Sequence, residues 1–384
     1  MVASRDMQSN YFTRLWRRSG VLVLFGLCVL IGAGTYRAAT QGQTKAFLIV
    51  QSDQGIHYGQ FEEDCPKGFE MTVEEAFLAT KSPQERERLL RPENSKEYAK
   101  GWKDDFITGP GGENVCNNPK SFVNDPLHPP FRGVTSKVAY GMNLDGVTDG
   151  SATAGTCGHD PFLSENGEPG IDNQLYRAIG CTKMHRSTGP AAHAYIRPFL
   201  LEIRGLDDVR NDDHVDVGIY STDDTPLQGP DGKAMSNQTL TITKNPRWRT
   251  TVAGRIVNGQ LTTDVADVIY LHEVLSTWCL FGQGYEYEFY KARFRMSLEA
   301  DGTLSGLLAS YRPIDNIFTT GRCCKGTAST ANFDCASEHK TLAMLADGNP
   351  DPETGQCTRI SSASNLKGIP VFAAAERGDL SSKN

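Results

Sequence analysis

The residues best suited to chemistry are concentrated in one stretch, from Asn143 to Cys181. Aspartate and glutamate are interleaved there with glycine, a composition that disfavours both helix and strand. Such sequences favour tight turns, which can direct several carboxylate oxygens toward one point. Calcium is bound by oxygens arranged in this way. The residues predicted to bind a calcium ion are Asp145, Asp149, Asp160, Glu168 and Asp172.

Two other interpretations of this stretch stay open. Aspartate and asparagine beside glycine are explained equally well by turn formation without any metal ion. A catalytic or transition-metal site is the second alternative, because imidazole and carboxylate groups are common ligands of such metals. Its members would be His159 with Asp160, Glu165 or Glu168, and with His185 nearby in the sequence.

The stretch does not follow the spacing of an EF-hand calcium loop. Counted from Asp145, the third and twelfth loop positions need oxygen ligands, but the chain has Val147 and Thr156 there. No H-E-x-x-H zinc motif is present either. A calcium site in this stretch would therefore have its own geometry.

The end of the acidic stretch has the pattern of a short helix. Asp172 or Asn173 can cap its N-terminus, and Gly180 can end it. Asp172 therefore has a structural role available besides metal binding. The apolar residues at helical spacing are Ile171, Leu175, Ala178 and Ile179.

The N-terminus has the features of a membrane anchor. Arg14, Arg17 and Arg18 precede a segment without charge that extends from Ser19 to Tyr36. A helix of this length nearly spans a hydrocarbon core, and the basic residues before it retain the N-terminus in the cytoplasm. We predict a cytoplasmic head (1–19), a transmembrane anchor (20–36) and an extracytoplasmic remainder, periplasmic or on the cell surface. A cleaved signal peptide is the alternative.

The cysteines support export. The chain has ten, and all except Cys28 follow the apolar segment, a distribution typical of disulfide-bonded extracytoplasmic proteins. We predict that Cys65 pairs with Cys116 and that Cys157 pairs with Cys181. Redox exchange through the adjacent Cys323 and Cys324 is a further hypothesis. Otherwise each of these two would pair with Cys335 or Cys357.

The first half of the exported part is predicted to be helical and rich in loops. Thr72 with Glu75 forms a capping box, and Ser82 followed by Pro83 marks a second helix start. A third helix is expected at 94–103, and a short strand at 46–50. We assign 37–135 to a small helical and loop region, and 136–190 to the acidic loop with its short helix.

The second half is predicted to be antiparallel β-structure. Asn258-Gly259 and Asp301-Gly302 each lie between segments of alternating hydrophobicity, which indicates two hairpins. A change of phase in 285–298 predicts a bulge at Tyr290–Lys291. We therefore expect an α+β, mainly β protein, with a jelly-roll-like β-sandwich over 191–320 and a cysteine-containing appendage over 321–384. A barrel is the alternative to the sandwich.

Charge and motifs limit the functions to consider. The net charge is −7 with no basic cluster in the exported part, which argues against binding nucleic acid. The P-loop, G-x-G-x-x-G and G-x-S-x-G motifs are absent from the sequence. The sequence predicts an exported, membrane-anchored envelope protein, a calcium-stabilised binding or structural module. The alternative is a glycan or ester hydrolase that uses acidic residues of the 143–181 loop.

Overall fold

The structure, a computed structural model, describes residues 42–108, 112, 114–187, 199–273, 285–317 and 334–375. The predicted cytoplasmic head and transmembrane anchor lie outside this part of the chain. In the described ranges no helix has the length and apolar character needed to cross a membrane.

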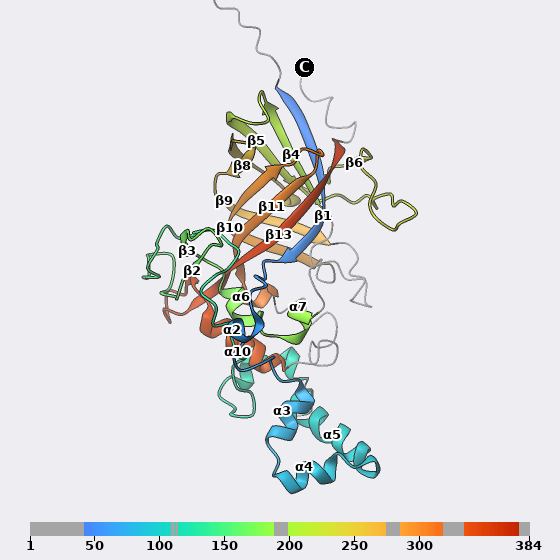
Figure 1. The fold of residues 1–384 in the computed structure, drawn as a ribbon, viewed down its shortest axis with the longest axis vertical. Helices are drawn as coiled ribbons and strands as arrows, with labels where there is room; N and C mark the ends of the chain where they lie inside the picture. Colours follow the sequence, from blue (N-terminus) through green and yellow to red (C-terminus); the bar gives the residue numbers. More distant parts are fainter. Residues whose placement is uncertain are drawn as a thin grey trace, which may run out of the picture. The chain divides into compact units, whose positions relative to one another are not determined.

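The fold is mostly β and is built on a closed, eight-stranded antiparallel barrel. Each barrel strand pairs with the next one along the chain, and the last pairs with the first (Figure 1). The strands of the ring are β1 (Gln43–Gln54), β4 (Phe199–Leu206), β5 (Asp212–Tyr220), β7 (Arg249–Val257), β8 (Gln260–Thr263), β10 (Tyr285–Leu298), β11 (Leu304–Pro313) and β13 (Cys357–Ala374). Three further strands flank the ring: β6 (Thr239–Thr241) and β12 (Gly348–Pro350) pair with β13, and β9 (Ala266–Glu273) pairs with β10.

The predicted jelly-roll-like sandwich is therefore wrong. The segment assigned to the sandwich contains β4 to β11, but the two strands that close the sheet, β1 and β13, lie outside 191–320. Ala46 is opposite Val371 in this closing pair, so the join is made by residues more than three hundred positions apart. A single sheet that meets itself leaves no free edge, whereas a sandwich has four.

The barrel interior is filled by apolar side chains from alternate positions. On β5, Val215, Val217 and Ile219 are fully buried on one face, as their alternation predicted. The predicted bulge in β10 is confirmed: Lys291 has a positive φ of 51°, and the register with β11 shifts between Tyr290 and Arg293. The shift directs both Phe289 and Phe294 into the core.

Both predicted hairpins are present. Asn258 and Gly259 have φ values of 54° and 83° and connect β7 to β8, while Gly302 (φ 82°) turns between β10 and β11. Positive φ at these positions suits the right-handed twist of the paired strands. The turn residues thus define the register of these pairs.

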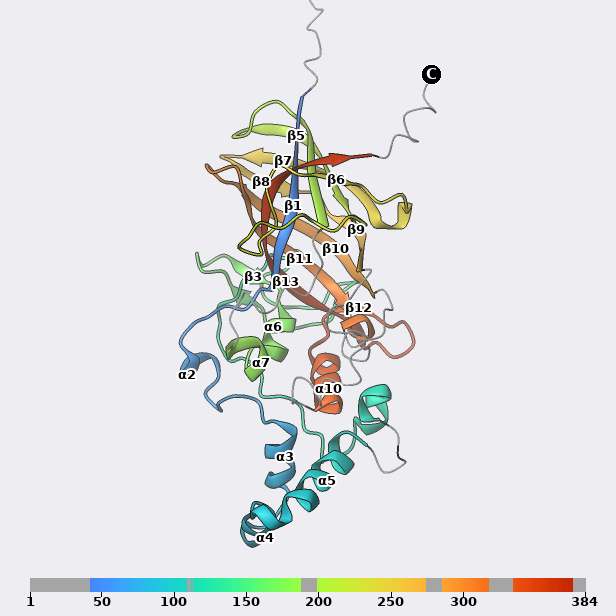
Figure 2. The same cartoon turned by 90° about the vertical axis from the view of Figure 1, so that its right-hand side faces the viewer.

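The helices lie between β1 and β4 and before β12. The predicted capping box at Thr72 and Glu75 is formed, and the Ser82 hydroxyl caps the next helix. Figure 2 shows α3 to α5 lying together, while α6 and α10 contact each other and β13. The longer helices are α3 (Val73–Ala79), α4 (Pro83–Leu89), α5 (Ser95–Phe106) and α10 (Cys335–Leu345); the short ones are α2 (Phe61–Asp64), α6 (Gln174–Ile179) and α7 (Lys183–Ser187). The short 3₁₀ helices are η1 (Pro92–Asn94), η2 (Val115–Asn117), η3 (Pro119–Phe122) and η5 (Pro246–Trp248).

Three disulfides are present in the described residues: Cys65–Cys181, Cys116–Cys335 and Cys157–Cys357. The predicted pairs Cys65–Cys116 and Cys157–Cys181 are wrong, as is pairing of Cys335 or Cys357 with Cys323 or Cys324. The observed bridges span 116, 219 and 200 residues, so they join parts of the chain that only the tertiary fold brings together. Cys28, Cys279, Cys323 and Cys324 lie outside the described residues. Three such bridges indicate an oxidising environment.

Candidate metal centre

The acidic stretch lies against the outer face of the barrel. Met142 and Leu144 pack on Ala309 and Tyr311 of β11, which anchors the segment that carries Asp145. Asp172 directly follows β3 (Pro169–Ile171), which pairs with β2 (Phe162–Leu163), and its backbone N–H donates to the Met142 carbonyl at 3.1 Å. Two segments about thirty residues apart are thereby placed side by side.

A close approach of two loop segments positions His159. The His159 N–H donates to the Gly150 carbonyl at 2.9 Å. Gly150 has a φ of 74°, and a Cβ there would lie 1.9 Å from the His159 carbonyl oxygen. Only glycine fits this position, because any side chain would displace the His159 segment.

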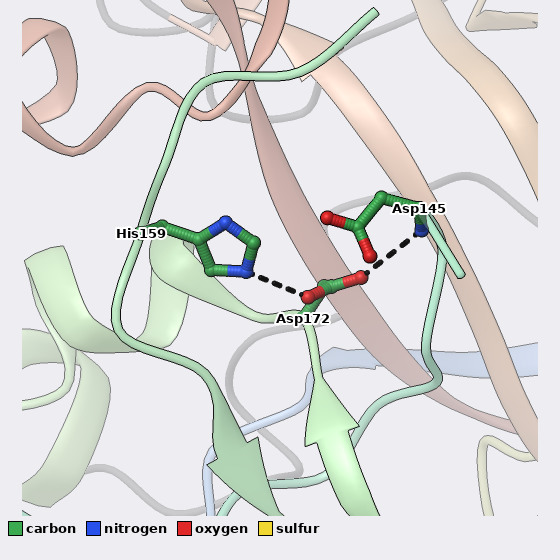
Figure 3. A group of neighbouring side chains, drawn as sticks. All are labelled: Asp145, His159 and Asp172. Atoms are coloured by element: carbon green, nitrogen blue, oxygen red, sulfur yellow. Dashed lines mark hydrogen bonds and ion pairs between the residues drawn. The ribbon is translucent and has the colours of Figure 1, made fainter. Parts of the chain in front are cut away.

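Asp145, His159 and Asp172 form one compact group (Figure 3). His159 Nε2 lies 2.8 Å from Asp172 Oδ1. The other carboxylate oxygen, Asp172 Oδ2, accepts from the Leu144 N–H at 2.6 Å and, at 3.4 Å, from the Asp145 N–H. One potential ligand atom from each of the three side chains lies within 4.8 Å of the others.

Burial determines the electrostatics of this group. The Asp172 side chain is fully buried, and 5% of the His159 side chain is exposed. Burial by itself lowers the pKa of His159, but the Asp172 hydrogen bond and the charge of Asp347 outweigh it and raise that pKa to about 9. Burial also raises the pKa of Asp145. The group therefore brings two carboxyl groups and an imidazole together in a poorly solvated place.

Three more polar side chains surround the group. Asp347 is fully buried, and burial raises its pKa to about 7. Tyr311 is 5% exposed, and Arg293 donates from Nη1 to the Asn143 carbonyl at 3.0 Å. Four buried atoms around the centre have no hydrogen-bond partner among the described residues: Asp145 Oδ2, Asp347 Oδ2, Tyr311 Oη and Arg293 Nε. Buried polar atoms of this kind call for a further partner, such as an ion or ordered water.

The five predicted calcium ligands do not converge. Asp145 and Asp172 come together, but Asp149 is exposed and accepts from the Ser151 N–H at 3.0 Å. Asp160 pairs with Lys137 at 3.1 Å and with Arg177, and Glu168 pairs with Arg295 at 3.2 Å. These three carboxylates form surface ion pairs or turns.

The partner of His159 in the structure differs from those predicted for the alternative metal site. Glu165 lies 3.5 Å from His57, and His185 is bonded to the Thr182 hydroxyl at 2.6 Å. His159 has Asp172 as its partner instead of Asp160, Glu165 or Glu168. Sequence reasoning did not place Asp347, Tyr311 and Arg293 at this site, because they come from strands and loops far away in the chain.

The donor set fits a divalent cation of borderline softness. Two carboxylates and one imidazole are ligands of zinc and of related transition metals. Bonds of about 2.0–2.2 Å to a shared zinc ion place tetrahedral ligand atoms about 3.4 Å apart, so the three side chains, now within 4.8 Å, would draw closer on binding it. Calcium prefers about six to eight oxygens, more than these two carboxylates supply.

Fold and site together define a disulfide-linked, closed β-barrel protein that carries a candidate metal centre on its outer face. Comparisons with protein-family models, with curated proteins and with solved structures found no match.

Proposed function

We propose that this protein is an exported, membrane-anchored envelope protein whose extracytoplasmic barrel is a binding or structural module stabilised by a divalent cation. The observation that carries the proposal is the compact group of Asp145, His159 and Asp172, in which Asp172 is buried and the other two residues are half-buried. Carboxylates in a poorly solvated site are normally paired or bound to a metal. The disulfides support export, since such bonds persist in oxidising compartments.

The burial of the group favours a structural cation over hydrolysis. A general acid or base must come within hydrogen-bond distance of the substrate. His159 and Asp172 are both nearly inaccessible, and the Asp172 carboxylate is already bonded to two backbone N–H groups and to His159. A cation held here would instead join the segments around residues 145, 159 and 172 on the barrel surface.

Zinc is the cation that the donor set favours, in place of the calcium expected from the sequence. The imidazole nitrogen of His159 is a good ligand for zinc and a poor one for calcium. Asp145 and Asp172 can each supply one oxygen, and water can complete a four-coordinate site. A zinc ion bound to these atoms would displace the proton shared by His159 Nε2 and Asp172 Oδ1.

Metal titration of the full-length chain in detergent tests the cation. We expect one zinc ion per chain and a higher melting temperature with zinc, because an ion that binds only the folded state stabilises it. His159→Gln and Asp172→Asn should each weaken zinc binding strongly and reduce the rise in melting temperature. Asp149→Asn is the matched control, since this carboxylate belongs to the same loop but only closes a turn. Equal zinc binding by wild type and His159→Gln would refute the proposed site.

A separate experiment tests export and anchoring. Reporter fusions after residue 60 should be active only outside the cytoplasm, and the chain should remain in the membrane fraction after alkaline extraction. Mass mapping should find the three bridges oxidised in protein from cells. Reduced cysteines at these six positions in freshly quenched cells would contradict export.

A further inference from the structure

The segment that carries His159 crosses the end of β13 and its partner β12. The Cys157 N–H donates to the Asp347 carbonyl at 2.8 Å, and the Asn349 N–H donates to the Gly155 carbonyl at 3.0 Å. An isolated bridge also pairs Thr156 with Gly348. These contacts hold the His159 segment to β12, which pairs with the barrel strand β13.

One disulfide closes this crossing covalently. Cys157 is bonded to Cys357, the first residue of β13, across a sequence separation of 200. Cys157 is also only two positions from His159. The other two bridges join segments elsewhere: Cys65 to Cys181 after α6, and Cys116 in η2 to Cys335 in α10.

Asp347 connects the His159 segment to the segment that carries Asp172. Its Oδ1 accepts from the Ser361 N–H on β13 at 2.7 Å, and the Ser361 hydroxyl accepts from the Gln174 N–H at 2.9 Å. Gln174 follows Asp172 by two residues. Asp347 is fully buried, with Oδ2 unpartnered among the described residues, so it belongs to the same polar neighbourhood as His159 and Asp172.

We propose that the Cys157–Cys357 disulfide is the positioning element of the metal centre, holding His159 and Asp347 beside Asp145 and Asp172. The cation affinity then depends on the redox state of this bridge. A dithiol reductant outside the cytoplasm would be oxidised to its disulfide, while Cys157 and Cys357 each gain an electron and a proton and become thiols. The His159 segment, released from β13, would then lose its fixed place. This inference rests on the proposed cation site.

The physical basis is preorganisation. Three ligands from separate segments form a tight site only when the fold fixes all three before the ion arrives. Groups that orient a metal ligand without touching the metal commonly change affinity by about 10–100-fold when they are removed. The Cys157–Cys357 bridge acts through His159, so its loss should weaken zinc binding by a factor in this range.

A double-mutant cycle with zinc as the probe tests this. Zinc dissociation constants are measured on the full-length chain by competition with a chromophoric chelator. The variants are wild type, Cys157→Ala/Cys357→Ala, His159→Gln and the triple combination. We expect the bridge variant to bind about tenfold or more weakly than wild type. Adding His159→Gln to the bridge variant should then weaken zinc binding by a much smaller factor than it does in wild type, because the effects of two coupled residues are not additive.

The matched control is Cys116→Ala/Cys335→Ala, which removes a bridge of similar span from the apolar cluster around α6 and α10. It should retain wild-type zinc affinity even if its melting temperature falls. A bridge variant with native melting behaviour and wild-type affinity would overturn the proposal, and so would equal loss of affinity in the control. Absence of zinc binding by wild type would instead refute the cation site itself.

If the Cys157 variant does not fold, wild-type protein decides the question. Cys157 is half-buried, whereas the other five bridged cysteines are buried, so mild treatment with a dithiol should reduce the Cys157–Cys357 bridge first. The thiols are then alkylated, and peptide mapping verifies which bridge was opened. Alkylation also prevents the new thiols from binding zinc themselves. Weaker zinc binding by these chains than by untreated protein supports the proposal, and unchanged binding refutes it.

Discussion

Asp172 has the most demanding environment of any residue in the centre. Its side chain is fully buried, yet it accepts hydrogen bonds from His159 and from two backbone N–H groups. Hydrogen bonds of this number compensate for the cost of removing a carboxylate from water. The same oxygens make Asp172 the residue on which the geometry of both neighbours depends.

Replacing Asp172 by asparagine should therefore destabilise the protein even without a cation. The amide nitrogen of asparagine cannot accept a hydrogen bond, so only one terminal atom can replace a carboxylate oxygen. Breaking a buried ion pair lowers the free energy of unfolding by about 3–5 kcal/mol. Urea denaturation in the presence of a chelator measures this free energy. Asp149→Asn should cost less than about 1 kcal/mol, since it affects an exposed turn. A similar loss in both variants would contradict the assigned role of Asp172.

Glu202 on β4 allows a test of pH dependence away from the centre. Burial raises the pKa of this carboxyl, although Arg204, 3.6 Å away, and Tyr220 act in the opposite direction. The folded-state pKa of Glu202 is above its unfolded-state pKa. The contribution of this carboxyl to folding stability is therefore complete below the unfolded-state pKa and is lost as pH rises through the folded-state pKa. Glu202→Gln should thus be more stable than wild type at pH 7 but not near pH 4. Parallel urea titrations at the two pH values check this; a larger gain at pH 4 would contradict it.

Residues of the site were predictable only where the sequence itself brings them close. Asp145 and Asp172 belong to the stretch whose composition suggested a cation site, and His159 lies between them. Asp149, Asp160 and Glu168 have the same side-chain chemistry, but composition cannot tell which carboxylates face inward. Asp347 is almost two hundred residues away and is placed by pairing with the Cys157 segment, which no local pattern reveals.

At the scale of elements, local signals gave correct predictions. The Thr72–Glu75 capping box, the Asn258-Gly259 turn and the bulge at Lys291 all depend on residues within a few positions of one another. β13 was missed because its run of serines, such as Ser361 and Ser362, lacks a hydrophobic alternation. These serines are nevertheless buried, in contacts with α6 and β11. The strand becomes recognisable only when those neighbours are in place.

The turn at Gly150 allows a prediction for the loop that carries His159. In Gly150→Ala the new Cβ would lie within 1.9 Å of the His159 carbonyl, so the segment must move. We expect lower stability and weaker zinc binding. Gly167→Ala is the control: its φ is 82°, giving comparable backbone strain, but nothing lies within 4 Å of its Cβ position. It should lose stability and keep its zinc affinity, as measured by chelator competition. Equal affinity in both variants would mean that the Gly150 contact does not position His159.

The whole molecule depends on closure of the barrel by the first and last strands. If the sheet were open, β1 and β13 would be its edge strands, and their outward amides would exchange with water after local fraying. In the closed ring, β1 is bonded to both β4 and β13, so its amides exchange only when the barrel opens. Native-state hydrogen exchange should give Leu48 and Ile49 the same opening free energy as Val217 in the middle of the sheet. Exchange of the β1 amides that is much faster than that of the β5 amides, under conditions where both strands are folded, would mean that the barrel is open in solution.

A closed ring also predicts that loss of β13 pairing destabilises β1 and β11 together, since β13 pairs with both strands along most of its length.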